Sequence, residues 1–364
     1  MLGTNDALGV LVRGRGKRRT TAIAIAVTLS LGGLATRAQA PAVSPTGSVG
    51  GLEAKFIDVQ GVRTRYYEMG QGETILLVHG GESWSAHSSA NTWVRNISGL
   101  SKRFHVLAPD RLGTGMTGAP VTDKDFNTQG ELAHLFQFLR AKNVTKVHIV
   151  GQSMGGMAAF YFAVAHPDIV KTLVIVNSAS LVPVDVGETN RPSMLAAQCP
   201  DARTDDFGEW RCRLRLLSSN PDRAFDEFYF ETGRFMMNQS KAKEILAKVA
   251  AGAGEPLRSQ AGEFKRKNLQ QVTDKGFGSM PVLLYWDKDD PSAILKGSTK
   301  VVDMKGALAL YDLIAAKTPN VRLLISQGGG HFPYRLHREE FNQNLMNFID
   351  FWNGPPTGEK TSRE

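Results

Sequence analysis

The chain has 364 residues, of which 42% are hydrophobic and 21% are charged. This ordinary globular composition excludes a disordered, collagen-like or coiled-coil protein. The formal net charge is +8, but residues 1–40 carry much of it, because they hold six basic residues and one acid. The rest of the chain is too weakly basic for an electrostatic footprint on nucleic acid, so we expect no nucleic-acid partner.

Residues 1–40 show the three parts of a secretion signal. A basic stretch runs from Arg13 to Arg19, an apolar stretch from Thr20 to Leu34, and Ala38-Gln39-Ala40 forms a small-residue cleavage site. An uncleaved membrane anchor is the alternative, but the apolar stretch is shorter than the roughly 20 residues of a spanning helix. We therefore predict a signal peptide, an exported protein that is periplasmic or secreted, and no stable membrane association after cleavage. The export route stays open.

Residues 41–54 are rich in Pro, Gly and Ser, which predicts a mobile linker. The segments Lys55–Val59 and Val62–Glu68, separated by Gln60-Gly61, are typical of a β-hairpin. Further short apolar runs are nearly continuous, as strands buried on both faces must be. These runs are Ile75–Val78, Phe104–Ala108, Val147–Val150, Leu173–Val176, Val282–Trp286 and Val321–Ile325.

Helical periodicity separates the apolar runs. It is clearest in two sets of residues: Leu132, Leu135, Phe136 and Leu139, and then Phe341, Leu345, Phe348, Ile349 and Trp352. Strands that alternate with helices predict an α/β fold, with a mostly parallel sheet flanked by helices. We assign residues 55–181 and 280–354 to this core and residues 355–364 to a flexible tail.

Residues 182–279 interrupt the alternation with helical patterns, many charges and no convincing buried strand. We predict an inserted helical cap, which lies over the carboxyl ends of the strands, where open parallel sheets bind ligands. Cys199 and Cys212, the only cysteines, both lie in this segment. We predict a disulfide between them, because disulfides persist in exported proteins. Two separate buried thiols are the alternative, because spacing alone does not determine pairing.

The motif Gly151-Gln152-Ser153-Met154-Gly155 follows a predicted strand and precedes the helical run Met157–Ala165. Glycines on both sides allow a tight strand-to-helix turn, which projects the serine hydroxyl above the sheet at a helix amino terminus. A purely structural turn is the alternative. Because the motif occurs once and in this context, we interpret Ser153 as a nucleophile.

A serine nucleophile needs a histidine base and a carboxylate that fixes its tautomer. His331 follows the last predicted strand and three glycines, an approach that brings its imidazole over the sheet. The acid is expected after the seventh strand, where Asp287, Asp289 and Asp290 crowd together, and only one of them can be the partner. No second cluster with metal-ligand spacing accompanies them in the sequence, so we expect neither a metal nor a cofactor.

Acyl transfer also needs hydrogen-bond donors for the developing oxyanion. His79-Gly80-Gly81 follows the strand predicted at Ile75–Val78. The N–H groups of Gly81 and Met154 are therefore expected to converge as an oxyanion hole. Gly80-Gly81 also suits a sharp turn, and we interpret His79 as structural.

On these residues the chain resembles the α/β-hydrolase superfamily, and within it the meta-cleavage product hydrolases and their esterase relatives. The matching stretches are His79-Gly80-Gly81, residues 108–115, residues 151–156, Asp290-Pro291-Ser292-Ala293, Gly330-His331-Phe332 and Glu340-Phe341-Asn342. In that family the acid is the last residue of a Gly-x-x-Asp turn. The resemblance therefore implies Asp290 as the acid, with Asp287 a departure at the glycine position.

Two further departures concern the substrate. The carbon–carbon hydrolases of this family carry a tryptophan after the catalytic histidine, where this chain has Phe332, and a cap arginine that grips the substrate carboxylate, for which Arg234 and Arg258 are only guesses. Apolar cap residues are available to roof a site, with cap core as the alternative role: Phe225, Phe228, Tyr229, Phe230, Phe235, Met236 and Met237. We predict Phe332, Phe230 and Met236 as substrate-binding residues.

The sequence thus predicts a serine hydrolase that cleaves a small carboxylic ester or lactone with an apolar or aromatic part. Carbon–carbon hydrolysis of a vinylogous diketo acid is the alternative. The leader favours the ester, because the resemblance implies that ring-fission products arise in the cytoplasm. A non-catalytic small-molecule binding protein is a third hypothesis. The oligomeric state stays open.

Overall fold

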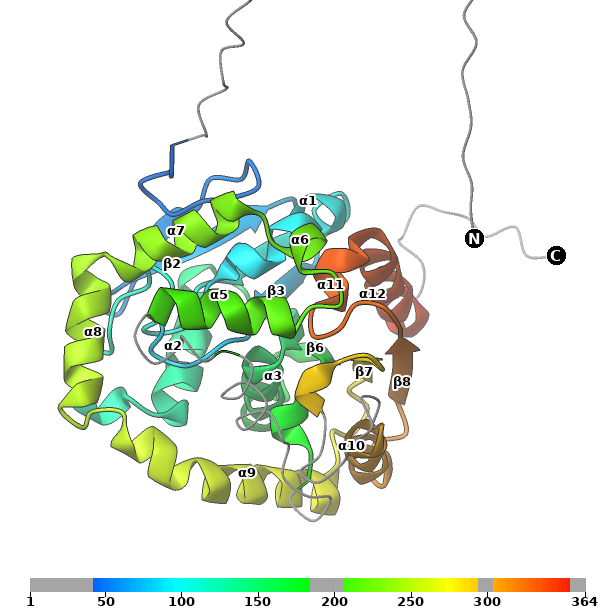
Figure 1. Ribbon diagram of the computed structural model, residues 1–364. Coiled ribbons are helices and arrows are strands. Elements are labelled where there is room, and N and C mark those ends of the chain that lie inside the picture. Colours follow the sequence, from blue (N-terminus) through cyan, green and yellow to red (C-terminus); the bar gives the residue numbers. More distant parts are fainter. Residues whose placement is uncertain (1–41, 184–198, 200–205, 294–303, 354–364) are drawn as a thin grey trace, which may run out of the picture. The chain divides into compact units, whose positions relative to one another are not determined.

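The computed structural model describes residues 42–183, 199, 206–293 and 304–353, so the predicted signal peptide and tail lie outside the described residues. Its centre is an eight-stranded sheet in the order β1-β2-β4-β3-β5-β6-β7-β8 (Figure 1). β2 runs antiparallel to β1 and β4, and the other neighbours are parallel. The strands are Lys55–Val59 (β1), Val62–Met69 (β2), Thr74–Val78 (β3), His105–Pro109 (β4), Val147–Gln152 (β5), Val170–Val176 (β6), Val282–Asp287 (β7) and Val321–Ser326 (β8).

Every predicted strand is present, because the apolar runs that suggested them are the buried centre of the sheet. All five residues of β3 and all six of β5 are buried. The predicted hairpin turns at Gln60 and Gly61, whose φ angles of 52° and 85° suit the tight turn that joins twisted strands.

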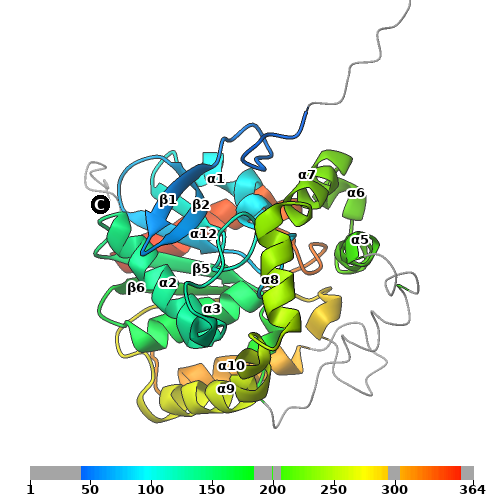
Figure 2. The same ribbon diagram turned by 90° about the vertical axis from the view of Figure 1, so that its left-hand side faces the viewer.

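Helices cover both faces of the sheet (Figures 1 and 2). Side chains of α2, α3 and α10 join one hydrophobic cluster with one set of strand residues, and those of α1 and α12 join a second cluster. The predicted α/β fold class is confirmed. These helices are Val94–Leu100 (α1), Thr128–Ala141 (α2), Met154–Ala165 (α3), Lys305–Ala315 (α10), Pro333–Leu336 (α11) and Arg338–Asn353 (α12).

The described residues between β6 and β7 form helices, as the sequence predicts. They are Asp206–Leu216 (α5), Pro221–Ala224 (α6), Glu227–Met237 (α7), Ser240–Ala250 (α8) and Glu255–Lys275 (α9). The end of α9 belongs to the core, because its Leu269 and Val272 pack in the same cluster as α3 and α10. Within the described ranges, no helix combines the length and the apolar character needed to cross a membrane.

Cationic side chains join the segment that carries α5–α9, which we call the cap, to the rest of the fold. Arg335 of α11 donates hydrogen bonds from Nε and Nη2 to the carbonyl oxygen of Ala224 at 3.0 and 2.7 Å. Lys241 of α8 donates to the carbonyl oxygens of Thr114 and Thr117 at 3.3 and 2.5 Å. Burial lowers the pKa of Lys241 to about 8. The acceptors on both sides of this seam are backbone carbonyls.

The segment predicted as a mobile linker, residues 41–54, is instead packed against the core where the structure describes it, in residues 42–54. The fully buried guanidinium of Arg65 donates to the carbonyl oxygens of Thr46 and Gly47 at 2.6 and 2.9 Å. A buried guanidinium has five N–H donors that need acceptors, and this segment supplies two of the acceptors. Val49 is only 5% exposed. The Pro, Gly and Ser content of the segment does not show that the buried Arg65 needs its carbonyl oxygens as acceptors.

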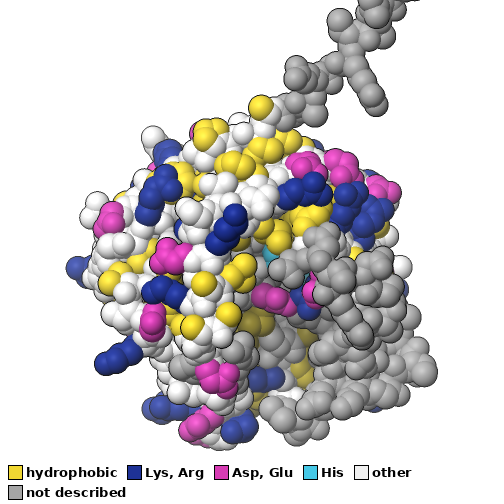
Figure 3. Space-filling model, turned by 60° about the vertical axis from the view of Figure 1, so that its left-hand side comes forward, with side chains coloured by type: hydrophobic (Ala, Val, Ile, Leu, Met, Phe, Trp, Pro, Cys, Tyr) yellow, Lys and Arg dark blue, Asp and Glu magenta, His cyan; other side chains and the backbone are white. Residues whose placement is uncertain are grey.

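The surface carries charges of both signs. On the face drawn in Figure 3, basic and acidic side chains are interspersed with hydrophobic ones. The described part of this face therefore shows charges of both signs rather than a field of one sign.

Candidate active site

Ser153 lies between the end of β5 and the start of α3, in a backbone conformation that non-glycine residues rarely adopt. Its φ is 55° and its ψ is −124°. The neighbouring glycines make this turn possible: a Cβ atom on Gly151 would lie 2.1 Å from the carbonyl oxygen of Gly155, and one on Gly155 would lie 2.3 Å from that of Val78. The strained turn is held in place by β5, α3 and β3. Strained backbone that the surrounding structure fixes in this way is typical of a functional site.

His331 and Asp290 form the hydrogen-bonded pair that a serine nucleophile needs. Nδ1 of His331 lies 2.9 Å from Oδ2 of Asp290, whose side chain is fully buried. The other carboxylate oxygen accepts the N–H of Ser292 at 2.8 Å, and the Ser292 hydroxyl lies 3.0 Å from the same Nδ1. These contacts favour the tautomer with the proton on Nδ1, which leaves Nε2 free to accept the proton of Ser153.

Ser153 and His331 line the same cavity. No hydrogen bond between their side chains is present in the described structure, as is common before a substrate binds. The structure thus brings Ser153 and His331 to one cavity, with Asp290 hydrogen-bonded to His331.

The two other aspartates after β7 hold the loop that carries the histidine. Oδ1 of Asp287 accepts the N–H of Gly330 at 3.1 Å, and Oδ2 accepts the N–H of Gly329 at 3.0 Å. Asp289 accepts the N–H of Gly328 at 2.8 Å. Burial raises the pKa of Asp287 despite these hydrogen bonds. Asp287, which departs from the glycine expected at its position, therefore fastens the approach to His331.

Gly81 and Met154 lie beside Ser153 in the cavity wall. Met154 is the first residue of α3, where backbone N–H groups have no acceptor within the helix. Gly80 passes so close to the nucleophile that a Cβ atom on it would lie 2.9 Å from Cβ of Ser153. Its carbonyl oxygen accepts a hydrogen bond from Nδ1 of His79 at 2.7 Å, which fixes the peptide plane that carries the Gly81 N–H.

Arg111 holds residues 79–81 in place. Its Nη2 donates to the carbonyl oxygen of Gly81 at 2.7 Å, and its backbone N–H donates to Nε2 of His79 at 3.0 Å. Its guanidinium is buried beside the carboxylate of Glu131, 3.4 Å away. Burial, together with the nearby Arg111 charge, lowers the pKa of His79 to about 3. His79 is therefore neutral and structural, as the sequence suggests.

The cavity above Ser153 has a volume of about 80 Å³. Phe332 lines it, as predicted, whereas Phe230 and Met236 do not. Both are fully buried, and Phe230 packs against Trp210. Met236 lies where the cap meets the amino-terminal segment, since a Cβ atom on Gly47 would come within 2.5 Å of its Cε. The structure therefore corrects their assignment: neither is a substrate-binding residue, and both have packing roles. Across the described residues, no group of three or more His, Cys, Asp or Glu side chains is arranged to hold a metal ion.

Helix α5 supplies the cap side of the cavity, a contribution that the sequence analysis missed. Trp210, Arg213 and Leu214 all face the cavity. The ring of His87 stacks on Trp210 with centroids 5.2 Å apart, and burial lowers the pKa of His87 to about 4. The one available signal was aromatic and basic residues at helical spacing next to Cys212.

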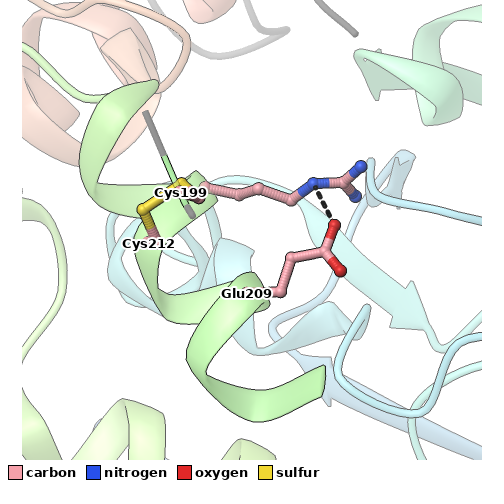
Figure 4. Close-up of a disulfide and its surroundings, with 4 residues drawn as sticks. Cys199, Glu209 and Cys212 are labelled. Atoms are coloured by element: carbon pink, nitrogen blue, oxygen red, sulfur yellow. Dashed lines mark ion pairs between the residues drawn. A yellow bond between two sulfur atoms is a disulfide. The ribbon is translucent and has the colours of Figure 1, made fainter. Parts of the chain in front are cut away.

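Among the residues whose side chains the structure describes, Arg213 and not Arg234 is the arginine that lines the cavity. It forms ion pairs with Glu82 and with Glu209, the latter with Nε and Oε1 3.1 Å apart (Figure 4). Arg234 is half-exposed and lies by Glu231 instead, at 3.8 Å. The side chain of the other guessed residue, Arg258, lies outside the described structure.

The predicted disulfide is confirmed. Cys199 and Cys212 are bonded, with Cα atoms 6.0 Å apart (Figure 4). Cys212 belongs to α5 and directly precedes Arg213. The bond therefore ties the helix that lines the cavity to a second point of the chain.

A family model described as "alpha/beta hydrolase fold" matches residues 73–337. The chain belongs to the alpha/beta hydrolase fold family. Ser153, Asp290 and His331 all fall within the matched range and occur in the order Ser, Asp, His that is usual for this fold. A strained serine that shares a cavity with a histidine bonded to a buried aspartate accords with hydrolase activity in this family.

The chain is similar to several proteins that are named as hydrolases. The 2-hydroxy-6-oxo-6-(2'-aminophenyl)hexa-2,4-dienoic acid hydrolase of Metapseudomonas resinovorans is 40% identical over 81% of this chain and 90% of that protein. A serine hydrolase involved in carbazole degradation is similar in structure, with a TM-score of 0.59 and 25% identity over 82% of this chain and 99% of that one. A meta-cleavage product hydrolase from Pseudomonas fluorescens shares the fold, with a TM-score of 0.61 and 21% identity over 82% and 98% of the two chains.

Proposed function

We propose that this protein is a serine hydrolase that cleaves the carbon–carbon bond next to a ketone in a small vinylogous diketo acid. The observation that carries the proposal is the similarity to the M. resinovorans hydrolase, which extends over most of both chains. The hydrogen-bonded pair of His331 and Asp290, in one cavity with Ser153, supplies the chemistry that such a reaction needs. The sequence favoured hydrolysis of an ester, whereas the relatives favour the alternative, carbon–carbon hydrolysis.

The reaction follows from the geometry of the site. Oγ of Ser153 attacks the ketone carbon while Nε2 of His331 takes its proton, and the N–H groups of Gly81 and Met154 bind the oxyanion. The carbon–carbon bond then breaks, and the leaving carbon takes the proton from His331. Water, deprotonated by the same imidazole, releases the acyl group from Ser153, while Asp290 balances the positive charge of the ring in each step.

Hydrolysis of an ester or lactone is the second candidate, and the environment of Arg213 favours it. Two carboxylates, those of Glu82 and Glu209, already pair with this guanidinium. A substrate carboxylate would therefore meet a group whose charge is balanced before it arrives. Phe332, where the resemblance implies tryptophan in carbon–carbon hydrolases, and the proposed signal peptide point the same way.

One comparison of substrates tests both candidates. The kcat/KM of the purified full chain is measured with 2-hydroxy-6-oxo-6-phenylhexa-2,4-dienoic acid and with phenyl acetate, each alongside Ser153→Ala. We expect serine-dependent turnover with a higher kcat/KM for the diketo acid. A higher value for the ester supports the second candidate. Equal rates for the wild type and Ser153→Ala on both substrates contradict any hydrolase function at this site.

A further inference from the structure

Two buried polar residues, Asn177 and Ser178, follow the last residue of β6 at the carboxyl end of the sheet. β6 lies between β5, which leads to Ser153, and β7, which leads to Asp290. The backbone N–H of Asn177 donates to the carbonyl oxygen of Tyr285 in β7 at 3.0 Å, so this point of the chain continues the pairing of the two strands. Both side chains are polar and inaccessible to solvent, yet the proposed reaction gives neither of them a part.

The side-chain amide of Asn177 joins the segment that carries the acid to the loop that carries the base. Its Oδ1 accepts the N–H of Asp287 at 2.8 Å, and its Nδ2 donates to the carbonyl oxygen of Gly330 at 2.8 Å. Asp287 begins the turn that leads to Asp290, and Gly330 directly precedes His331. One amide group therefore links the two backbone segments from which Asp290 and His331 extend.

The hydroxyl of Ser178 reaches the nucleophile instead. Its Oγ donates to the carbonyl oxygen of Ser153 at 2.7 Å. Helix α3 packs against the same side chain, because a Cβ atom on Gly156 would lie 2.9 Å from Cβ of Ser178. Since Asn177 and Ser178 are neighbours in the chain, the end of β6 holds the backbone of Ser153 and the backbone beside His331 at the same time.

We propose that Asn177 and Ser178 are positioning residues, which hold Ser153 and His331 at the separation that proton transfer needs. The inference rests on the proposed function, in which His331 takes the proton of Ser153. That transfer requires the two groups within hydrogen-bond reach, and a displacement of about 1 Å is enough to cost roughly 100-fold in rate. Hydrogen bonds from one strand end to the backbone of both partners restrict such a displacement.

Reaction with diisopropyl fluorophosphate measures this proton transfer without a natural substrate. Oγ of Ser153 forms a bond to phosphorus, the phosphorus–fluorine bond breaks and fluoride leaves, and His331 takes the serine proton. The second-order rate constant of phosphorylation is measured by mass spectrometry of the purified full chain. We expect the wild type to react and Ser153→Ala not to react. A wild type that is not phosphorylated defeats the proposed function and this inference together.

Asn177→Gly removes the bridging amide, and glycine suits the φ angle of 45° at this position. We expect the rate constant to fall roughly 10- to 100-fold, because only the amide of Gln152, which donates to the carbonyl oxygen of His331 at 3.1 Å, still ties the loop by a neutral side chain. Asn143→Gly is the matched control, since Asn143 also has a positive φ, 55°, and lies in the turn before β5, away from the cavity. The control is expected to stay within about twofold of the wild type. A wild-type rate constant in Asn177→Gly overturns the inference and leaves the hydrolase function intact.

The same substitutions in a His331→Ala background separate positioning from a general loss of structure. Without the imidazole the separation no longer matters, so we expect the loss caused by Asn177→Gly to shrink to within about twofold. An equal fold-loss in both backgrounds shows a merely structural role and contradicts the inference. Ser178→Ala and Asn177→Asp, which keeps an acceptor oxygen but not the amide donor to Gly330, test the two ties separately. Each is expected to lose at least about threefold, again only when His331 is present.

Discussion

Asp287 offers the sharpest test of how the fold positions the catalytic histidine. The residue ends β7, is only 1% exposed, and accepts hydrogen bonds from the buried N–H groups of Gly329 and Gly330. Replacing it with alanine leaves both N–H groups without an acceptor. Replacing it with asparagine keeps one acceptor oxygen and places an NH₂ group against the other donor.

The expected cost follows from counting these donors. A buried donor without a partner costs about 1–3 kcal/mol. Asp287 also accepts the part-buried N–H of Asp289 and hydroxyl of Ser326, and only the two fully buried N–H groups enter this cost. Asp287→Ala strands both and is expected to lower the free energy of unfolding by about 2–6 kcal/mol, and Asp287→Asn strands one and lowers it by about 1–3 kcal/mol. Because Gly330 precedes His331, we also expect kcat to fall roughly 10- to 100-fold in the alanine variant, the effect of a small displacement of a catalytic group.

Urea unfolding and steady-state kinetics of the same preparations measure both effects. Asp289→Asn is the matched control, since Asp289 lies two residues away, is partly exposed, and its carboxylate accepts the exposed N–H of Gly328 and lies 4.0 Å from the ammonium group of Lys288. The control is expected to stay within about 1 kcal/mol of the wild type. An Asp287→Ala protein with wild-type stability and wild-type kcat would refute the idea that this carboxylate fixes the loop.

Three further predictions follow. Ser153→Ala removes the nucleophile, and Asp290→Asn removes the carboxylate partner of the histidine. Each variant is expected to lower kcat by about 10³-fold or more while the urea midpoint stays unchanged. Near-normal turnover in either variant would disprove the role of that residue. Loss of the Cys199–Cys212 bond, in Cys199→Ser, is expected to lower the free energy of unfolding by about 3 kcal/mol, and unfolding of the wild type and the variant in reducing buffer should then coincide. Burial disfavours the charge of Glu68, but hydrogen bonds from neighbouring lysine and histidine side chains outweigh it and lower its pKa from 4.5 to about 2. The carboxylate therefore stabilises the fold above pH 4.5 and loses this effect toward pH 2, so the Tm of Glu68→Gln should lie below that of the wild type at pH 6 and converge with it in acid; a constant difference would contradict this.

The sequence predicts the parts of this protein that depend on neighbours in the chain. The strands can be predicted because each is a run of apolar residues. The turn around Ser153 can be predicted because it needs glycines at fixed positions on both sides of the serine. The order of the triad follows from the order of the strands. These features require no knowledge of which side chains meet across the fold.

The cavity walls were harder to predict, because they depend on contacts between distant segments. Arg213 lines the cavity above Ser153 because α5 lies over the carboxyl ends of the strands, and the aromatic and basic residues near it in the sequence do not show which arginine reaches the cavity. Phe230 and Met236 look equally suitable as a roof or as a core, and only the packing of the cap decides. The role of Asp287 was hidden because its partners, Gly329 and Gly330, lie after the next strand.

The seam that closes the cap has a consequence for how the protein tolerates change. Lys241 and Arg335 donate to main-chain oxygens, and every residue type presents such an oxygen. Mutations on the accepting side, around Thr117 and Ala224, therefore leave the acceptors in place as long as the backbone keeps its path. Salt screens exposed ion pairs strongly but weakens these largely buried hydrogen bonds much less. These two contacts therefore depend little on the accepting side chains or on ionic strength, whereas the exposed ion pair between Lys248 of the cap and Asp123 is open to screening by salt.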